Sequence, residues 1–265
     1  LTKGHWLRPQ DLGVLAGLGF SRTRVFERPK IAILSTGDEI VPITSSPGPG
    51  QVRDVNSYTL GALCRRMGAE PLYGGICPDR FGAMKEAVFE ALQQADALWI
   101  SGGSSVGTRD LTLAVFEALP DFELLVHGIS ISPGKPTIIA RSGNKPVVGL
   151  PGHVASALVV AEVFMTRLIA GLSGLPRPVA DSHRYVRATV AQNIESTSGR
   201  EDYVRVRLVE ADDTLKAVPI FGKSGLISTL VQADGLLRID IYAEGLYEGD
   251  EVDVMILHSG TGRSC

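Results

Sequence analysis

The stretch DALWISGGSSVGTRDLTLAVFEAL, residues 96–119, contains the pattern that decides the fold. Its first part, residues 96–101, is a short apolar run that predicts a buried β-strand. Its last part, residues 111–119, has apolar residues at helical spacing, and Asp110 stands where a helix N-cap is expected. A loop rich in glycine and serine joins the two. The stretch therefore predicts one strand–loop–helix unit of a parallel sheet.

The same alternation extends in both directions from this unit. Short apolar runs predict further strands, and helical periods lie between them; the strands are at 30–36, 69–76 and 145–150, and the helices at 57–68, 81–95 and 154–172. Strands that alternate with helices form a parallel sheet covered on both faces. We therefore expect an α/β domain, a three-layer, mostly parallel sheet with helices on both faces.

The pattern changes after residue 173, where two prolines and a glycine follow the last long helix. Beyond them, apolar and polar residues alternate with a period of two, which predicts half-buried antiparallel strands and a small all-β domain. The first residues contain one short helix, with Pro9 near its start and Gly19 at its end, and resemble the tail of a preceding domain. The expected divisions of the chain are residues 1–28, 29–176 and 177–265.

The composition limits the class of protein. Hydrophobic residues make up 44% and charged residues 21% of the chain, so it can bury a sizeable core. The formal net charge of −3 provides no basic surface for nucleic acid. Glu162 and Arg167 interrupt the apolar run at 154–172, which favours a buried helix over a membrane span.

Cysteine usage and the start of the chain add two expectations. There are three cysteines, an odd number without C-x-x-C spacing, which favours reduced thiols and a cytoplasmic location. No secretory signal pattern opens the sequence. The first residue is Leu1 instead of methionine, and we expect the chain to be a piece of a longer protein.

Ligands of open parallel sheets bind beyond the carboxyl ends of the strands. The segments that follow the expected strands share glycine, small hydroxyls and charged groups; they are residues 35–39, 78–79, 101–110, 132–136 and 151–153. Taken singly, Lys135 could be a solvated surface lysine and His153 a packing or capping residue. A sheet with a purely structural role does not need charged and hydroxyl groups in every turn. The five segments together therefore predict a binding site at the carboxyl edge of the sheet.

Charge adds a further expectation. Glycine-rich loops that lead into helices hold phosphate groups on backbone N–H groups. Glu39, Asp79 and Asp110 beside such a loop would repel a phosphate unless a cation lay between them. Mg²⁺ is commonly held by one or two carboxylates and by phosphate oxygens. The residue types therefore predict an anionic ligand together with Mg²⁺.

A different interpretation treats Gly103–Gly107 as the G-x-S-x-G pattern of a serine hydrolase, with Ser105 as the nucleophile. That mechanism needs an acid and a histidine later in the chain, for which Asp121 and His153 are available. However, no oxyanion loop of the H-G-G-G type precedes the serine. The doubled glycine and the run to Asp110 fit a phosphate cradle better, so the hydrolase is a distant alternative.

The motifs STGDE, VNSYTLGALCRRMGAE, GGSSVGTRD, SPGKPT and GLPGHVAS occur here in the order seen in the MoeA/gephyrin family of molybdopterin molybdenumtransferases, which the chain resembles over nearly its whole length. GKSGLISTLVQADGLLRI is similar to the C-terminal domain of that family. The resemblance implies a molybdopterin-binding α/β domain followed by a small β-barrel, with two further domains before Leu1. It also implies insertion of molybdate into adenylylated molybdopterin with Mg²⁺ and release of AMP.

The resemblance assigns roles to individual residues. It implies catalytic roles for Glu39, Asp79, Asp110 and Lys135, with Glu39 and Asp110 as the ligands of Mg²⁺. The remaining motif residues are implied to bind the pterin substrate; they are Gly37, Asp38, Asn56, Ser57, Ser101, Gly102, Gly103, Ser104, Ser105, Gly107, Pro133, Gly134, Pro136, Pro151, Gly152, His153 and Ser156. It further implies a homodimer and contacts with other molybdenum cofactor assembly proteins. The composition and the interrupted apolar run, for their part, indicate neither nucleic acid nor a membrane as a partner.

Three positions depart from the family pattern. Ser132 stands where the family usually has a lysine, Thr108 where it usually has a glutamate, and His153 where it commonly has an asparagine. Loss of one lysine removes a cation from an anion site, which weakens a charged hydrogen bond by about 1–3 kcal/mol. The alternative function is therefore a non-catalytic or divergent molybdopterin-binding module.

Overall fold

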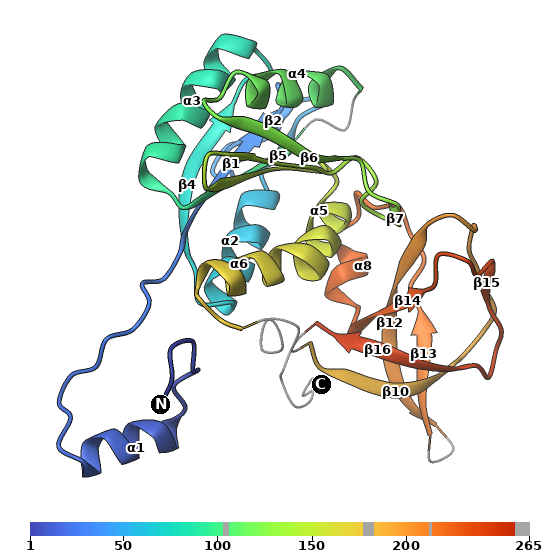
Figure 1. The fold of residues 1–265 in the computed structure, drawn as a ribbon. Coiled ribbons are helices and arrows are strands. Elements are labelled where there is room, and N and C mark those ends of the chain that lie inside the picture. Colours follow the sequence, from blue (N-terminus) through green and yellow to red (C-terminus); the bar gives the residue numbers. More distant parts are fainter. Residues whose placement is uncertain (103–105, 177–182, 212–213, 258–265) are drawn as a thin grey trace.

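The computed structural model describes residues 1–102, 106–176, 183–211 and 214–257 (Figure 1). A parallel-sheet domain and a β-barrel follow each other along the chain. A short N-terminal helix, α1 (Pro9–Gly17), is joined to the sheet domain by an extended segment. Asp11 is the buried residue of α1, and it accepts hydrogen bonds from the backbone and side chain of Arg8.

The first sheet has the strand order β4-β1-β5-β9-β8-β6. Four neighbouring strands run parallel; they are β4 (Glu70–Cys77), β1 (Lys30–Thr36), β5 (Ala97–Gly102) and β9 (Lys145–Leu150). β8 (Ile138–Ser142) is antiparallel to both of its neighbours, β9 and β6 (Phe122–His127). β2 (Ile40–Val41) and β3 (Val52–Arg53) form a separate two-stranded pair after β1. The sheet is therefore mostly parallel, as predicted.

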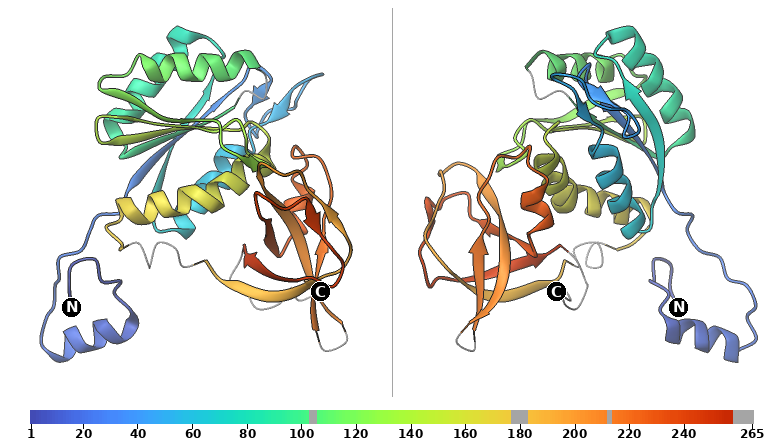
Figure 2. Two further views of the ribbon diagram at one scale, coloured as in Figure 1. Left: turned by 45° about the vertical axis from the view of Figure 1, so that its right-hand side comes forward. Right: turned by 180° about the vertical axis from the view of Figure 1, so that it is seen from behind.

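Helices cover both faces of this sheet (Figures 1 and 2). On one face, α3 (Phe81–Gln94) and α4 (Val106–Glu117) pack on β-strand residues such as Leu34 and Ile100. On the other, α2 (Asn56–Arg66) and the long helix that begins at Val154 pack on Ile33 and Trp99. Most residues of β1 and β5 are apolar, and since side chains alternate between the two faces, both faces of these strands are apolar. The predicted three-layer domain is confirmed.

The long apolar helix lies inside the molecule. It consists of α5 (Val154–Val160), a π-helical turn (Ala161–Met165) and α6 (Thr166–Leu172). By length and composition the run Val154–Leu172 could cross a membrane, but 72% of it is buried in the protein. It is therefore the central helix of the sheet domain, in agreement with the prediction for this segment.

The second part of the chain forms a closed five-stranded β-barrel. Its strands follow one another in space as β10 (Tyr185–Val190), β16 (Glu251–Ile256), β14 (Gly235–Ile239), β12 (Glu201–Ala211) and β13 (Thr214–Pro219). β13 returns to β10 and closes the barrel. Its interior is filled by residues such as Val206, Leu237 and Val254. The predicted β-rich tail is confirmed as a barrel.

Smaller elements complete the barrel region. β11 (Ile194–Glu195) pairs with β15 (Gly245–Leu246), and a short helix, α8 (Ser228–Val231), precedes β14. β7 (Ile131–Ser132) comes from the sheet domain, yet it pairs with Glu201 and Asp202 of β12. The two domains therefore share backbone hydrogen bonds.

Two details of the prediction are wrong. Asp110 does not cap its helix, because α4 begins at Val106 and Asp110 lies inside it. Val106, Gly107 and Thr108 have low helix propensity, so the local sequence predicts a loop up to Asp110, and the helical conformation of this turn overrides that propensity. In the barrel, β10 and β13 are parallel, whereas the alternating pattern predicts antiparallel strands. Their pairing closes the barrel, and the sequence pattern within each strand does not show which strands pair on closure.

Candidate functional site

A cleft opens at the carboxyl edge of the parallel strands, where the sequence predicts a site. It has a volume of about 330 Å³. Predicted site residues make up much of its lining; they are Glu39, Asn56, Ser101, Gly102, Gly152 and His153. The barrel contributes Gly225 and Ile227 to the same cleft. The ends of β1, β5 and β9 and a loop of the second domain therefore meet in one place.

Asn56, the first residue of α2, ties two of these strand ends together. Its side-chain amide donates one hydrogen bond to Ser101 Oγ at 2.6 Å and another to the Gly152 carbonyl at 2.8 Å. Asn56 and Ser101 are both buried. Because both amide hydrogens are used, the acceptor oxygen of Asn56 is the group it can offer to a ligand.

Asp54 lines the cleft and is a residue that sequence reasoning missed. Its carboxylate is buried and accepts hydrogen bonds from the hydroxyls of Ser35, at 2.9 Å, and Ser57, at 2.5 Å. It also accepts a bond from the Ser57 backbone N–H, as helix-capping carboxylates do. Asp54 thereby joins the end of β1 to the start of α2. An acidic residue three positions before Ser57, at a helix start, was the available signal.

Two glycines are required by the geometry of the cleft. At Gly102 an added Cβ would lie 2.1 Å from the Thr36 carbonyl oxygen, so β1 and β5 approach too closely here for any side chain. Gly37 has φ +147°, and a Cβ there would lie 2.9 Å from the Glu39 carboxylate. These two glycines permit Glu39 and the start of the Gly-Ser loop to come together.

Asp79 lies beside the cleft without lining it. Its carboxylate accepts a hydrogen bond of 2.5 Å from the Thr36 hydroxyl, and Thr36 lines the cleft. The Asp79 backbone N–H donates to the exposed Asp38 carboxylate at 3.2 Å. Burial raises the pKa of the neighbouring Cys77 thiol, and the Asp79 charge raises it further. The turns after β1 and β4 are thus in contact, as the sequence predicts.

The loop that contains Lys135 is placed differently from expectation. Gly134 is buried, and a Cβ added to it would lie 2.6 Å from the Val160 side chain. The Gly134 carbonyl accepts a hydrogen bond from the Thr137 hydroxyl. Lys135 itself is exposed and does not belong to the cleft lining. The flanking Pro133 and Pro136 are half-buried. The structure therefore does not bring Lys135 into the cleft.

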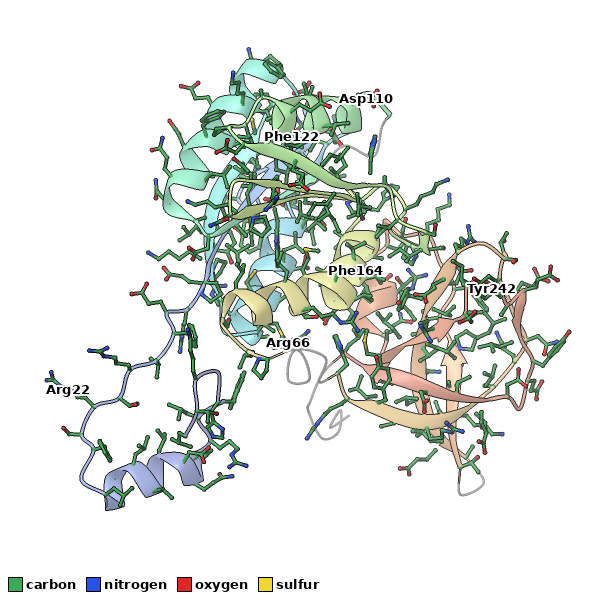
Figure 3. The ribbon with its side chains drawn as sticks, viewed as in Figure 1. Arg22, Arg66, Asp110, Phe122, Phe164 and Tyr242 are labelled. Carbon is green, nitrogen blue, oxygen red and sulfur yellow. The ribbon has the colours of Figure 1, made fainter. Side chains whose placement is uncertain are left out.

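Asp110 is also outside the lining. It is exposed on α4, near the end of that helix which faces the carboxyl edge of the sheet (Figure 3). Gly107 belongs to the first turn of the same helix. Gly103, Ser104 and Ser105, the centre of the predicted phosphate cradle and of the hydrolase alternative, lie outside the described residues.

His153 connects the cleft to the barrel. It is exposed and occupies the N-cap position of α5, without capping that helix through its side chain. Its Nδ1 lies 3.2 Å from Ser224 Oγ of the barrel loop. The Ala155 N–H, in the first turn of α5, donates to the Ser224 carbonyl at 3.0 Å. Pro151 and Ser156, also predicted as site residues, are buried next to these contacts in the chain.

A parallel-sheet domain with a polar cleft at its carboxyl edge, joined to a barrel that contributes to the cleft, defines an α/β ligand-binding protein. Residues 32–171 match the family described as "Probable molybdopterin binding domain", and residues 187–257 match the MoeA C-terminal region (domain IV). The chain belongs to the MoeA family. The resemblance noted in the sequence motifs is thereby confirmed.

Individual relatives agree with this assignment. The chain is 31% identical to a molybdopterin molybdenumtransferase of Nostoc sp. over 95% of its own length and 58% of the relative. It is 35% identical to that of Haemophilus influenzae over 77% of this chain and 50% of the relative. The crystal structure of a molybdopterin biosynthesis MoeA protein from Pyrococcus horikosii superposes with a TM-score of 0.83 at 34% identity, covering 98% of this chain and 62% of that one. The chain thus spans about half to three fifths of these proteins.

Proposed function

We propose that this chain provides the pterin site of an enzyme that inserts molybdate into adenylylated molybdopterin, in an Mg²⁺-dependent reaction that releases AMP. The observation that carries the proposal is the meeting of Glu39, Asn56, Ser101 and Gly152 in one cleft beyond the parallel strands. Membership in the MoeA family and the names of the relatives support it. A role in molybdenum cofactor biosynthesis follows from that membership.

The cleft suits a metal that the substrate helps to hold. Within the described residues, no three histidine, cysteine or acidic side chains are grouped for a metal, so a preformed protein cage is not the expected site. Glu39 and Asp54 both line the cleft. The two carboxylate oxygens of Asp54 already accept hydrogen bonds from Ser35 and Ser57, so Glu39 is the carboxylate that we assign to the metal. Mg²⁺ is typically bound by one or two carboxylates and by phosphate oxygens. Glu39 and Asp110 would hold it, and it would offset the charge of the phosphate oxygens.

The chain's own groups have the following proposed roles. Gly102 and the residues after it, Gly103, Ser104 and Ser105, bind the terminal phosphate of the pterin through backbone N–H and hydroxyl groups. Asp79 lies next to the metal or the molybdate, held by Thr36. Lys135 neutralises phosphate or molybdate, which requires its loop to present the side chain when the substrate binds. In such a cleavage the protein mainly positions groups and offsets charge.

Asp110→Ala provides the direct test in the full-length protein. This variant should lose Mg²⁺-dependent AMP release while still binding molybdopterin, because the change removes the proposed metal ligand on α4 and leaves the cleft lining itself intact. Unchanged turnover would remove Asp110 from the mechanism. The isolated 265-residue chain should turn over weakly, and the full-length protein should act as a cytoplasmic homodimer that works with other cofactor assembly proteins.

A second candidate is a binding module without catalysis. The exposed position of Lys135 outside the cleft favours it, together with Ser132 in place of a second lysine. Calorimetry with adenylylated molybdopterin, followed by an assay for AMP, separates the two functions. Tight binding without AMP release by the full-length protein would support the module and contradict the enzyme.

A further inference from the structure

Arg205 of β12 places a charge at the apolar contact between the barrel and the central helix. It lies directly opposite Leu236 in the pairing of β12 with β14. Side chains of directly opposite residues point to the same face of a sheet. Leu236 is buried, and it packs with Val159 and Val163 of the central helix. Arg205 therefore lies on the face of the barrel that meets the central helix.

The Arg205 guanidinium is only partly used by hydrogen bonds. Its Nη2 donates to the Gly222 carbonyl at 3.1 Å. Nε and Nη1 have no contact with solvent, and among the described residues neither has a hydrogen-bond partner. Burial lowers the pKa of Arg205 below its ordinary value, which reflects the free-energy cost of burying the charge. A methionine would fill similar space without that cost, so stability alone does not account for the arginine.

The bond to Gly222 anchors the barrel loop that reaches the cleft, residues 220–227. Two residues after Gly222, the carbonyl of Ser224 accepts a hydrogen bond of 3.0 Å from the N–H of Ala155, in the first turn of α5. The next residue, Gly225, lines the cleft. The guanidinium therefore holds this loop close to the point where the loop meets the sheet domain.

We propose that Arg205 is a positioning residue for the reaction, which fixes loop 220–227 on the sheet domain through the Gly222 carbonyl. The proposal rests on the proposed function and adds a residue outside the cleft lining to it. Small displacements of groups around a reacting substrate lower the rate strongly, even when the changed residue lies away from the chemistry. A buried charge that is unfavourable for stability is expected where function decides the residue.

Arg205→Met in the full-length protein tests the role in the reaction. It should lower kcat/KM for AMP release at least about tenfold. The urea midpoint of unfolding should stay the same or rise, because an apolar side chain replaces a buried charge. Arg205→Lys should keep kcat/KM within about threefold, since Nη2 alone is bonded to Gly222 and one lysine donor can replace it. Arg207→Met is the matched control, as Arg207 is exposed on the same strand, and it should leave kcat/KM unchanged.

Hydrogen exchange at the Ala155 amide tests the position of the loop without any substrate. The first N–H groups of a helix have no partner within the helix, so the protection of this amide depends on the Ser224 carbonyl. Arg205→Met should speed its exchange at least about tenfold, because the loop opens more often. The amide of Val159, one turn further along α5, should exchange as in the unmodified protein.

The remaining outcomes are decisive. Unchanged exchange at Ala155 with Arg205→Met would overturn the proposal, and so would unchanged kcat/KM. A loss of activity together with a lower unfolding midpoint would show a merely structural role and would also overturn it. If the unmodified full-length protein releases no AMP from adenylylated molybdopterin while exchange at Ala155 still depends on Arg205, the proposed function fails and the positioning of the loop by Arg205 stands.

Discussion

Arg66, at the end of α2, is bonded to the buried carboxylate of Glu162 in the π-helical turn of the central helix, with Arg66 Nη2 2.6 Å from Glu162 Oε1. The same guanidinium donates to the carbonyl of Leu257, just after the last barrel strand, at 2.6 Å. Thr166 and His183 contact the backbone carbonyl of Glu162. One charged pair thus holds together α2, the central helix and the barrel.

Arg66→Ala should destabilise the folded chain by about 2–3 kcal/mol, because it leaves the buried Glu162 carboxylate without its partner. This expected destabilisation is smaller than that for a fully buried ion pair, since the Arg66 side chain is half-exposed. Urea unfolding measures the change. Arg65→Ala is the control, as Arg65 contacts the exposed Tyr73, and it should change stability by less than about 1 kcal/mol. Equal losses in both variants would contradict the role of the pair.

The cost of Arg66→Ala should depend on pH. Burial raises the pKa of Glu162 above its ordinary value, and the Arg66 charge opposes that rise. A raised folded-state pKa means that the folded chain keeps a proton that the unfolded chain releases, so stability falls as pH rises between the two pKa values. Without Arg66 the rise is larger. The destabilisation should therefore be greatest near about pH 7 and should shrink towards about pH 4. A pH-independent loss would argue against Glu162.

Gly102→Ala should destabilise the fold by about 1–3 kcal/mol, because the new Cβ would overlap the Thr36 backbone. It should also weaken phosphate binding, since β5 and the loop after it must shift. Gly171→Ala is the matched control. Gly171 lies in α6 with no atom within 4 Å of an added Cβ, so this change should stabilise the helix by about 0.5–1 kcal/mol. Thermal unfolding would show the two changes with opposite signs.

Asn56→Ala should lower kcat/KM for AMP release at least about tenfold in the full-length protein, a loss of about 1.4 kcal/mol in transition-state stabilisation. The reason is that Ser101 and the Gly152 carbonyl lose their common donor. Thr59→Ala, one turn further along α2, removes only a bond to the Asn56 carbonyl and should leave kcat/KM within about twofold of the unmodified protein. Comparable losses in both would indicate damage to the helix instead of the cleft.

Glu39→Gln should raise the Mg²⁺ concentration needed for half-maximal AMP release about tenfold or more, because an amide is a weaker ligand than a carboxylate for this cation. Glu70→Gln is the control, since Glu70 is exposed at the start of β4, away from the cleft. The measurement is a Mg²⁺ titration of the full-length protein. An unchanged midpoint with Glu39→Gln would remove Glu39 as a metal ligand.

Much of the fold could be predicted because its pattern is local. Met84, Val88 and Leu92 recur at helical spacing and all three are buried in α3, and the run from Lys30 to Thr36 is a strand with those bounds. Closure of the barrel was implied by the family resemblance and not by the local pattern, because it depends on the pairing of Thr189 and Val190 with a strand more than twenty residues away.

The site was predictable to the extent that strand ends define it. Glu39 and Gly152 follow parallel strands and Ser101 lies at the end of one, and the parallel sheet brings the three together. Lys135 was not predictable in this way, because packing of Gly134 on the central helix decides how that loop is oriented. Asp54 was missed because its importance comes from Ser35, which lies nineteen residues earlier in the sequence.

β7 gives the molecule a shared seam. The chain leaves the sheet domain at Ile131 and Ser132, lies along Glu201 and Asp202 of the barrel, and then returns to form β8. A barrel grafted from another protein would therefore need to offer a matching free edge to this two-residue strand. Loss of this pairing on either side would detach the barrel from the sheet domain at this point, and the cleft to which both domains contribute would be disturbed with it.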